Sequence, residues 1–286
     1  EGRLTGKGTL GKKANMKIPE CDIRKANITV LQNSTVVAPY MEEHLNIVRS
    51  SNPNKSEAWV TCEHLNTFAA WLRRKCIGDE TLDQQLQWLA RGPSITVMQY
   101  QGYEINGYTF YTRDQDKKST NQNSGVRIDA IDNDGKKDSY YGVIEEIWEL
   151  IYGPITVPLF RCQWVRGAGV TIDKFGMTIV DFSKIGYKEE PFVLAKDVKQ
   201  VFYVKDMASK PKKGAKKAPE DANEPRRHIV LPGKRKIVGV EDITDQSEDF
   251  DQLEDERPPF SVDIDPSILL SQEDAPYLRE DHKQGT

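Results

Sequence analysis

The sequence has few cysteines and no long apolar run, and each absence narrows what the chain can be. Its four cysteines, Cys21, Cys62, Cys76 and Cys162, show no paired short spacing, which argues against a disulfide framework and fits a reducing compartment. No apolar run approaches membrane-spanning length and no signal-peptide pattern opens the chain, so we expect no membrane partner. Only 37% of the 286 residues are hydrophobic and the mean hydropathy is −0.63, so we expect part of the chain not to fold. Because it begins with Glu1 rather than Met, we interpret the sequence as a fragment of a longer protein.

A dense series of β-prone runs lies between Asp138 and Asp206. Period-two alternation of aromatic and β-branched residues is typical of strands, and short strands with tight connections favour a small sheet or barrel. Upstream, Asn106-Gly107 between two aromatic runs predicts a hairpin. The four central runs are Tyr140 to Ile151, Val157 to Val165, Gly176 to Phe182 and Val198 to Val204.

The residues before this series repeat at helical spacing. The strongest helix is predicted over 56–77, with Ser56 as its N-cap and Gly78 as its stop. Shorter helices are predicted over 22–33, from Pro39 to the Asn52-Pro53 break, and over 81–90.

These patterns predict an α+β chain in four parts. Residues 1–20 are interpreted as a linker and residues 21–93 as a helical subdomain. Residues 94–206 are predicted to form a small antiparallel β-barrel-like module, of an SH3-like kind, and residues 207–286 a disordered basic-then-acidic tail.

The net charge of −4 conceals a strong asymmetry in that tail. A basic run is followed, from Glu241 on, by an acidic one. Clustered Lys and Arg either contact DNA phosphates, act as a bipartite nuclear localisation signal, or form a solvated linker, and all three interpretations stay open. The candidate nucleic-acid contacts are Lys212, Lys213, Lys216, Lys217, Arg226, Arg227, Lys234, Arg235 and Lys236.

Exposed aromatic side chains are a second candidate binding feature. Small barrels use them as stacking platforms for nucleic acid or as cages for methylated lysine, although most aromatics of a small barrel fill its core. We assign Trp148, Trp164 and Phe202 to the core and predict Tyr108 and Tyr141 to be exposed.

No catalytic or metal-binding set emerges from the residues. Cys62 and His64 lie two positions apart on a predicted helix and so face different ways, which argues against a zinc site with His44 and Cys76. Strict alternation would keep Glu145 and Glu149 on the face opposite Glu146, and no histidine lies in the central series to act as a base. Asp173 and Asp181 complete the carboxylates considered for a two-metal nuclease site. We therefore expect no enzyme activity, cofactor, metal or small-molecule substrate.

Several consecutive motifs resemble a known family. The runs 140–150 (YYGVIEEIWEL), 157–165 (VPLFRCQWV), 186–192 (GYKEEPF) and 200–206 (QVFYVKD) resemble a domain of unknown function in plant CACTA (En/Spm-like) transposon-associated proteins. With lead-in motifs such as 88–93 (WLARGP), the resemblance extends from about Pro39 to Asp206. Two departures concern loops: Ile151-Tyr152 stands where Asp-Tyr is usual, and 126–138 is shorter than in many relatives. The same strands are similar, more weakly, to bromo-adjacent-homology modules of chromatin proteins.

The resemblance implies a role without assigning catalytic residues. It implies a non-catalytic accessory module, C-terminal to a transposase region, that binds DNA or chromatin in the nucleus. The alternative is a protein-interaction or structural domain that holds the transposase assembly together. Either way, the partners implied are DNA, chromatin or the transposase region of the same or a related protein.

Overall fold

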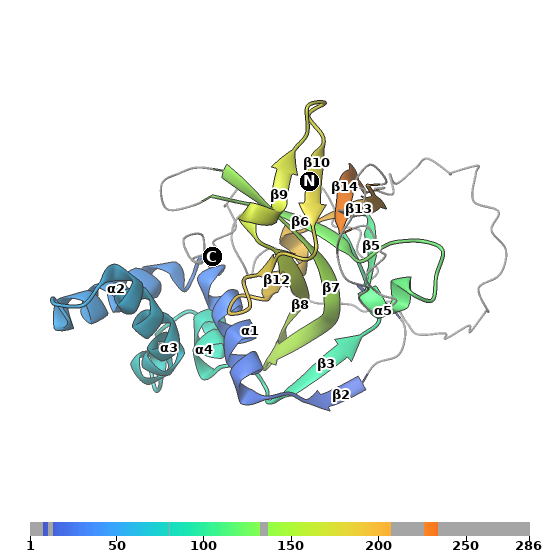
Figure 1. Cartoon of the computed structure of the whole chain (residues 1–286). Coiled ribbons are helices and arrows are strands. Elements are labelled where there is room, and N and C mark those ends of the chain that lie inside the picture. Colours follow the sequence, from blue (N-terminus) through green and yellow to red (C-terminus); the bar gives the residue numbers. More distant parts are fainter. Residues whose placement is uncertain (1–7, 11–13, 80, 132–136, 207–225, 234–286) are drawn as a thin grey trace.

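A computed structural model describes residues 8–10, 14–79, 81–131, 137–206 and 226–233. Helices come first and a strongly curled antiparallel sheet follows, so the chain has the predicted α+β fold (Figure 1). The sheet forms a half-barrel, and the helices pack at one side of it. Within the described residues, no helix has the length and apolar character needed to cross a membrane.

Two of the four helices that precede the sheet begin at a side chain that caps them. Ser56 caps one of them as predicted, because its hydroxyl accepts a hydrogen bond from the Trp59 amide at 3.3 Å. The last helix begins later than predicted, because the Asp83 carboxylate accepts from the amides of Gln85 and Leu86. These helices are α1 (Glu20–Gln32), α2 (Ala38–Ser51), α3 (Glu57–Cys76) and α4 (Gln84–Arg91).

Two long strands, β7 (Lys137–Tyr152) and β8 (Ile155–Val165), form the centre of the half-barrel. Before them come β1 (Gly8–Leu10), β2 (Ala14–Lys17), β3 (Thr96–Tyr100), β4 (Gly102–Ile105), β5 (Tyr108–Tyr111), the short helix α5 (Arg113–Asp116) and β6 (Gly125–Ile131). After them come β9 (Val170–Ile172), β10 (Thr178–Asp181), β11 (Ile185–Gly186), β12 (Phe192–Leu194), β13 (Lys199–Lys205) and β14 (Arg227–Pro232).

The order of the strands departs from their order in the chain. β7 and β8 pair antiparallel with a bulge between Ile144 and Glu146. Beyond β7 the sheet continues through β6, β13, β14 and β10 to β9, while β3 and β2 extend from the other half of β7. β1, β4 and β5 form a separate three-stranded sheet among the described residues. The strand β14, far along the chain, therefore lies between β13 and β10.

The hairpin predicted at Asn106-Gly107 is confirmed. β4 and β5 pair antiparallel up to Ile105 and Tyr108, so the two intervening residues make the whole turn. Asn106 has φ 55° and Gly107 has φ 76°. Positive φ at both central residues is the type I′ turn, whose twist matches that of paired strands.

Three short strands lie where the sequence predicts unstructured chain. The linker interpretation is wrong for β2 and β1, which pair with β3 and β4. The tail interpretation is wrong for β14, which pairs with β13 from Val201–Pro232 to Lys205–His228. Strands this short show little alternation of apolar and polar residues. Their extended conformation is determined by pairing with a neighbouring strand rather than by local propensity. Residues 207–225 and 234–286 of the predicted tail lie outside the described residues.

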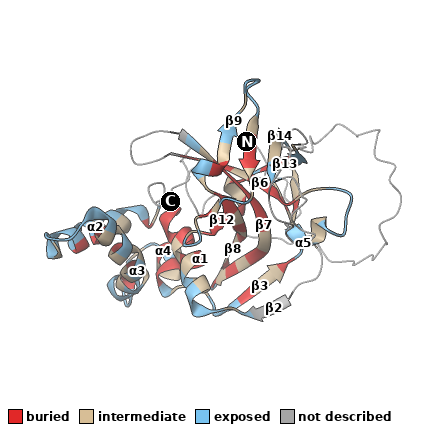
Figure 2. Ribbon diagram, viewed as in Figure 1, coloured by how far each residue is buried: buried red, intermediate tan, exposed pale blue. Residues whose placement is uncertain are grey.

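The core lies inside the half-barrel and between it and the helices (Figure 2). Trp148 and Trp164 are buried as predicted, with 1% and 0% of their surface exposed. The assignment of Phe202 to the core is wrong: Phe202 is half-buried and its neighbour Tyr203 is buried. A shift of one residue along a strand exchanges the two faces of the sheet, so this error is one of register.

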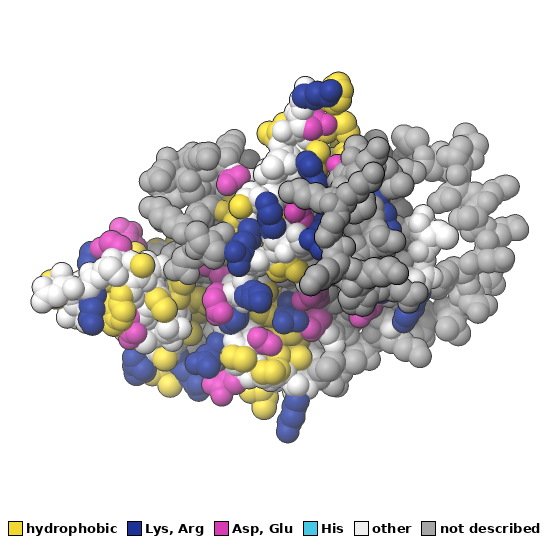
Figure 3. Space-filling view, in the orientation of Figure 1, with side chains coloured by type: hydrophobic (Ala, Val, Ile, Leu, Met, Phe, Trp, Pro, Cys, Tyr) yellow, Lys and Arg dark blue, Asp and Glu magenta, His cyan; other side chains and the backbone are white. Residues whose placement is uncertain are grey.

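The β9–β10 hairpin projects from the body of the molecule (Figure 1). Its free end carries apolar and basic side chains together (Figure 3). Ile172 is 74% exposed and Phe175 is 75% exposed, and both are among the most exposed large hydrophobic residues described.

Candidate nucleic-acid interface

A groove of about 890 Å³ lies between α5 with its following loop and the strands β13 and β14. Residues of five separate segments line it, so the groove exists only in the folded chain. They are Arg113, Asp116, Lys117, Ser119, Thr120, Asn121, Gln122, Ser124, Val143, Phe182, Ser183, Tyr203, Lys205, Arg226 and His228.

Positive charge dominates this groove. Its lining holds four guanidinium or ammonium groups, on Arg113, Lys117, Lys205 and Arg226, against the single carboxylate of Asp116. All four basic residues are exposed. Lys117 also contacts Asp114 at 2.8 Å, but both side chains of that pair are largely exposed, so the pair contributes little and the lysine can exchange partners.

The loop that forms one rim is held by hydrogen bonds rather than by apolar packing. The Asp116 carboxylate accepts from the amides of Asn123 and Ser124, both at 2.9 Å. The Gln122 side-chain oxygen accepts from the Tyr203 amide across the groove at 2.5 Å. The carboxylate in the lining is therefore used to shape the loop, and the rim is fixed relative to β13.

The base of the groove rests on a second, smaller core. Phe182 packs edge-on against Tyr203, with ring centroids 4.8 Å apart, and against His228 at 5.3 Å. Tyr203 is buried, and its hydroxyl donates to the carbonyls of Gly142 at 2.8 Å and Val126 at 3.2 Å. This core gives the cationic rim a rigid base.

A carboxylate beside the groove is kept ionised by its neighbours. Burial opposes ionisation of Asp181, but hydrogen bonds from the Ser183 hydroxyl and amide outweigh it. The positive charges of Lys184 and Arg226 act in the same direction, and the pKa of Asp181 lies below its ordinary value.

The structure places part of the predicted basic set at this groove. Arg226 lines it, and Arg227 lies 4.0 Å from the Asp206 carboxylate. The remaining predicted contacts, Lys212, Lys213, Lys216, Lys217, Lys234, Arg235 and Lys236, lie outside the described residues.

The chain that carries the first four of those lysines leaves and returns at the groove. Lys205 and Arg226 both line it. The Asp206 amide donates to the Arg227 carbonyl at 2.9 Å, so the two ends of the connection lie side by side.

Sequence reasoning missed three of the four cations in the groove. Arg113 and Lys117 belong to the polar segment 113–124, for which no site was predicted, and Lys205 follows the run predicted as a strand over 198–204 and ends the observed β13. Arg113 and Lys117 lie in one segment and Lys205 in another, and both segments lie outside the basic run of the predicted tail. Only the fold brings them together, and the single sequence signal was the polar composition of 113–124.

The predicted aromatic platform does not form. Tyr141 is 6% exposed and belongs to the second core with Val180 and Tyr203, so its predicted exposure is wrong. Residues of β10 and β13 cover it there. Tyr108 is half-buried against the main core, with its ring 5.9 Å from that of Phe110. The two tyrosines therefore pack in different clusters.

The carboxylates of β7 are closer together than strict alternation predicts. The bulge after Ile144 lets Glu145 and Glu146 both approach Arg161, at 3.6 Å and 2.7 Å. The expectation that they point to opposite faces is wrong for this pair, because a bulge adds a residue and resets the alternation. Glu146 also accepts from the indole N–H of Trp148 at 2.8 Å. A carboxylate with these partners serves as a structural acceptor.

The histidines considered for a metal site pair with each other. Nδ1 of His44 lies 2.8 Å from Nδ1 of His64 between α2 and α3, and both side chains are buried. Cys62 is exposed and Cys76 is buried. In the described part of the chain, no group of three or more His, Cys, Asp or Glu side chains is arranged to hold a metal ion.

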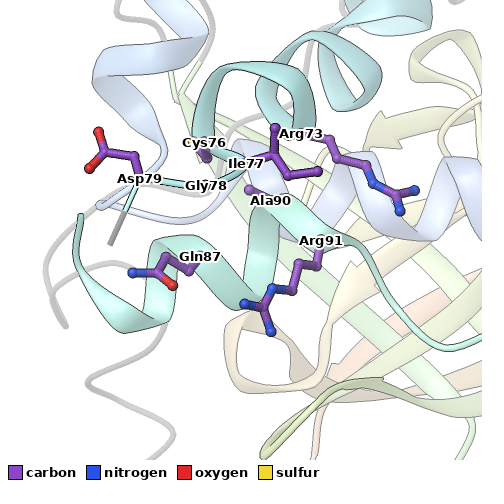
Figure 4. A pocket seen from close by; sticks show the side chains of 8 residues that line it. All are labelled: Arg73, Cys76, Ile77, Gly78, Asp79, Gln87, Ala90 and Arg91. Carbon is purple, nitrogen blue, oxygen red and sulfur yellow. The ribbon is translucent and has the colours of Figure 1, made fainter. Parts of the chain in front are cut away.

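A smaller pocket of about 340 Å³ lies between the C-terminus of α3 and α4 (Figure 4). Arg73 and Arg91 contribute two guanidinium groups to its lining. They point in different directions, and Arg91 lies over the Trp88 ring at 4.6 Å. The pocket therefore does not direct two cations at one anion, and the larger groove remains the candidate site.

Comparison with known families gives one match. Residues 148–214 match a family described as a domain of unknown function (DUF4216). The matched residues run from the second half of β7 through β8 to β13, and exclude helices α1–α4. Of the four groove cations they include only Lys205. No curated protein and no solved structure matches the chain.

Proposed function

We propose that the groove binds the phosphate backbone of DNA and that the chain acts as a non-catalytic, DNA-binding accessory module. The observation that carries this proposal is the convergence of Arg113, Lys117, Lys205 and Arg226 on one groove with a single, already engaged carboxylate. Cations that replace the counterions of phosphates supply most of the affinity of sequence-independent DNA binding.

The flanking sequence supports the same proposal. The connection between Lys205 and Arg226 holds Lys210, Lys212, Lys213, Lys216 and Lys217, and both of its ends lie at the groove. Basic residues tethered there add their charge to the four cations of the lining. Binding by such a set falls steeply with salt concentration.

The setting we propose is a plant CACTA transposon-encoded protein that acts in the nucleus, with DNA or chromatin and a transposase region as its partners. The DUF4216 match at 148–214 and the ordered motifs that resemble this family support it. The absence of catalysis is supported by the engagement of Glu145 and Glu146 with Arg161.

The first test measures binding of the full chain to a labelled duplex by fluorescence anisotropy across a salt series. We expect the logarithm of the binding constant to fall linearly with the logarithm of salt concentration. Lys205→Ala and Arg226→Ala should each weaken binding and reduce that slope by about one. Arg49→Ala is the matched control, because Arg49 is an exposed cation on α2, paired with Glu57 and outside the groove.

A second variant separates the groove from the lysine-rich connection. Replacing 207–225 by a Gly/Ser linker of equal length removes the lysines and keeps β14. We expect weaker binding that still responds to Lys205→Ala. If this variant loses all binding, or if Lys205→Ala and Arg226→Ala bind like the unmodified chain, the groove is not the DNA site. A chain that binds no DNA at any salt concentration would leave the protein-interaction alternative.

A further inference from the structure

The free end of the β9–β10 hairpin exposes apolar side chains on a well-ordered turn. Ile172 and Phe175 are about three-quarters exposed, and Met177 is 36% exposed. Exposed aromatic and aliphatic groups that gather on one projection mark a contact site more often than scattered ones do.

This exposure is built into the turn rather than produced by a loose loop. One carboxylate oxygen of Asp173 accepts from the amides of Phe175 and Met177, at 2.8 Å and 2.9 Å. The Asp173 amide donates to the Met177 carbonyl at 2.9 Å, and Gly176 supplies the positive φ of 81° that closes the turn. Phe175 is therefore presented to solvent by a preorganised backbone.

The hairpin is continuous with the basic groove. β10 pairs with β14, and the Phe182 amide just after β10 donates to the Arg226 carbonyl at 3.2 Å. Phe182, Ser183 and Arg226 all line the groove. At about 3.3 Å per residue, Phe175 lies at most about 23 Å from Phe182. That is less than one helical turn of B-DNA, about 34 Å, so one duplex can reach both.

The chemistry of the tip fits DNA better than an apolar protein pocket. Phe, Ile and Met are among the side chains that proteins insert between base steps as wedges. The ammonium of Lys174 lies 4.8 Å from the centroid of the Phe175 ring, so a cation for the flanking phosphates stands beside the apolar group.

We propose that the tip inserts Phe175, with Ile172 beside it, into a base step of the duplex held by the groove, and bends that duplex. This inference rests on the DNA binding proposed above and adds the way in which the DNA is deformed. Unstacking one step is repaid by the additional surface that the bent duplex brings into contact.

The test measures the end-to-end distance of a doubly labelled duplex by energy transfer, using the full chain at saturating concentration. We expect the unmodified chain to shorten that distance. Phe175→Ala and Ile172→Ala should bind without shortening it, with affinity reduced on the order of ten-fold for Phe175→Ala. The slope of affinity with salt should not change, because neither variant removes a charge. Ile95→Ala is the control, since Ile95 is 75% exposed and lies outside the hairpin.

The outcomes separate this inference from the proposed function. A duplex bound equally tightly and bent equally by Phe175→Ala overturns the wedge and leaves the groove intact. A duplex that no version of the chain binds overturns both. If Phe175→Ala leaves DNA binding and bending unchanged but abolishes self-association in sedimentation, the tip contacts a second copy of the chain and the wedge is wrong.

Discussion

At the scale of single residues, Tyr203 connects the base of the groove to the sheet. Its hydroxyl reaches the carbonyls of Gly142 and Val126 from inside the second core, and burial raises its pKa well above the ordinary tyrosine value. The group therefore remains a hydrogen-bond donor throughout the stable pH range. A donor that joins β13 to β7 and β6 helps to fix the distance between these strands.

Removing that hydroxyl should measure its contribution. Tyr203→Phe keeps the ring but leaves two buried carbonyls without this donor, and we expect the free energy of unfolding to fall by about 1 to 2 kcal/mol. Urea unfolding followed by circular dichroism gives the value. Tyr108→Phe, at a half-buried tyrosine of β5, serves as the control and should change stability by less. Equal effects at both positions would contradict the role assigned to the Tyr203 hydroxyl.

Gly125 is required by the close approach of β6 to β13. A Cβ atom added there would lie 2.2 Å from the Val201 carbonyl oxygen, which belongs to the backbone and cannot rotate away. We expect Gly125→Ala to cost about 1 to 3 kcal/mol or more, measured as a lower urea midpoint. At Gly167 the nearest atom is 3.8 Å away, so Gly167→Ala should be nearly neutral. A neutral Gly125→Ala would show that the two strands can separate at no cost.

The burial of a single residue could be predicted where its own size and hydrophobicity decide it. It could not be predicted where strand register or a distant strand decides it. Trp148 and Trp164 are large and apolar, and any packing of these strands buries them. Tyr141 is buried because residues of β10 and β13 cover its face of β7, where all residues from Tyr140 to Ile144 are buried. The exposure of Phe202 depends on which face of β13 points inward. Neither the covering strands nor the inward face is visible in the local sequence.

At the scale of elements, the contact between α2 and α3 contains a buried pair of titratable rings. Burial, and then the charge on Arg74, lower the pKa of His44, while Glu63 acts in the opposite direction. Burial, and then the charge on His44, lower the pKa of His64 to about 4. Both rings therefore remain neutral when the chain is folded at neutral pH, with one Nδ1 donating to the other.

This pair should make stability depend on pH. An unfolded histidine has a pKa of about 6.5, so between that pH and about 4 the unfolded chain binds a proton that folded His64 does not. The contribution of neutral His64 to the free energy of unfolding is then fully present above pH ~6.5. It is lost as the pH falls toward the pKa of folded His64, and the loss is on the order of 3 kcal/mol. Urea midpoints measured at several pH values give the slope. His64→Gln should flatten the curve in this window, and an unchanged slope would place its origin elsewhere.

Elements long enough to show several periods of the hydrophobic pattern could be predicted from the sequence, and elements too short to show a full pattern could not. The helix α3 spans 20 residues and shows its apolar stripe and its Ser56 cap in the sequence. The strand β1 has three residues and β2 has four, so neither contains a full pattern. Their conformation follows from the edges that β4 and β3 offer, which is information from another part of the chain.

At the scale of the whole molecule, the candidate site could likewise be predicted only in part from the sequence. The sequence predicted an α+β chain and a role for basic residues near its end, and Arg226 does line the groove. It could not bring Arg113, Lys117 and Lys205 to the same place. Their proximity depends on a sheet order in which β6, β13, β14 and β10 are neighbours, and charge patterns within one segment carry no information about that order.

The position of β14 changes how a truncation must be interpreted. Ending the chain after Asp206 removes a strand that pairs with five residues of β13 and three of β10. It therefore breaks the sheet between β13 and β10 as well as removing basic residues.

We expect this truncation to lower the free energy of unfolding by more than about 2 kcal/mol. A chain that ends after Gly233 keeps β14 and should unfold at the same urea concentration as the full chain. If both truncations have equal midpoints, β14 contributes nothing to stability, and loss of DNA binding after Asp206 can be assigned to the lost charges alone. If they differ as expected, only the chain that ends after Gly233 and the linker replacement of 207–225 can separate the contribution of charge from that of the fold.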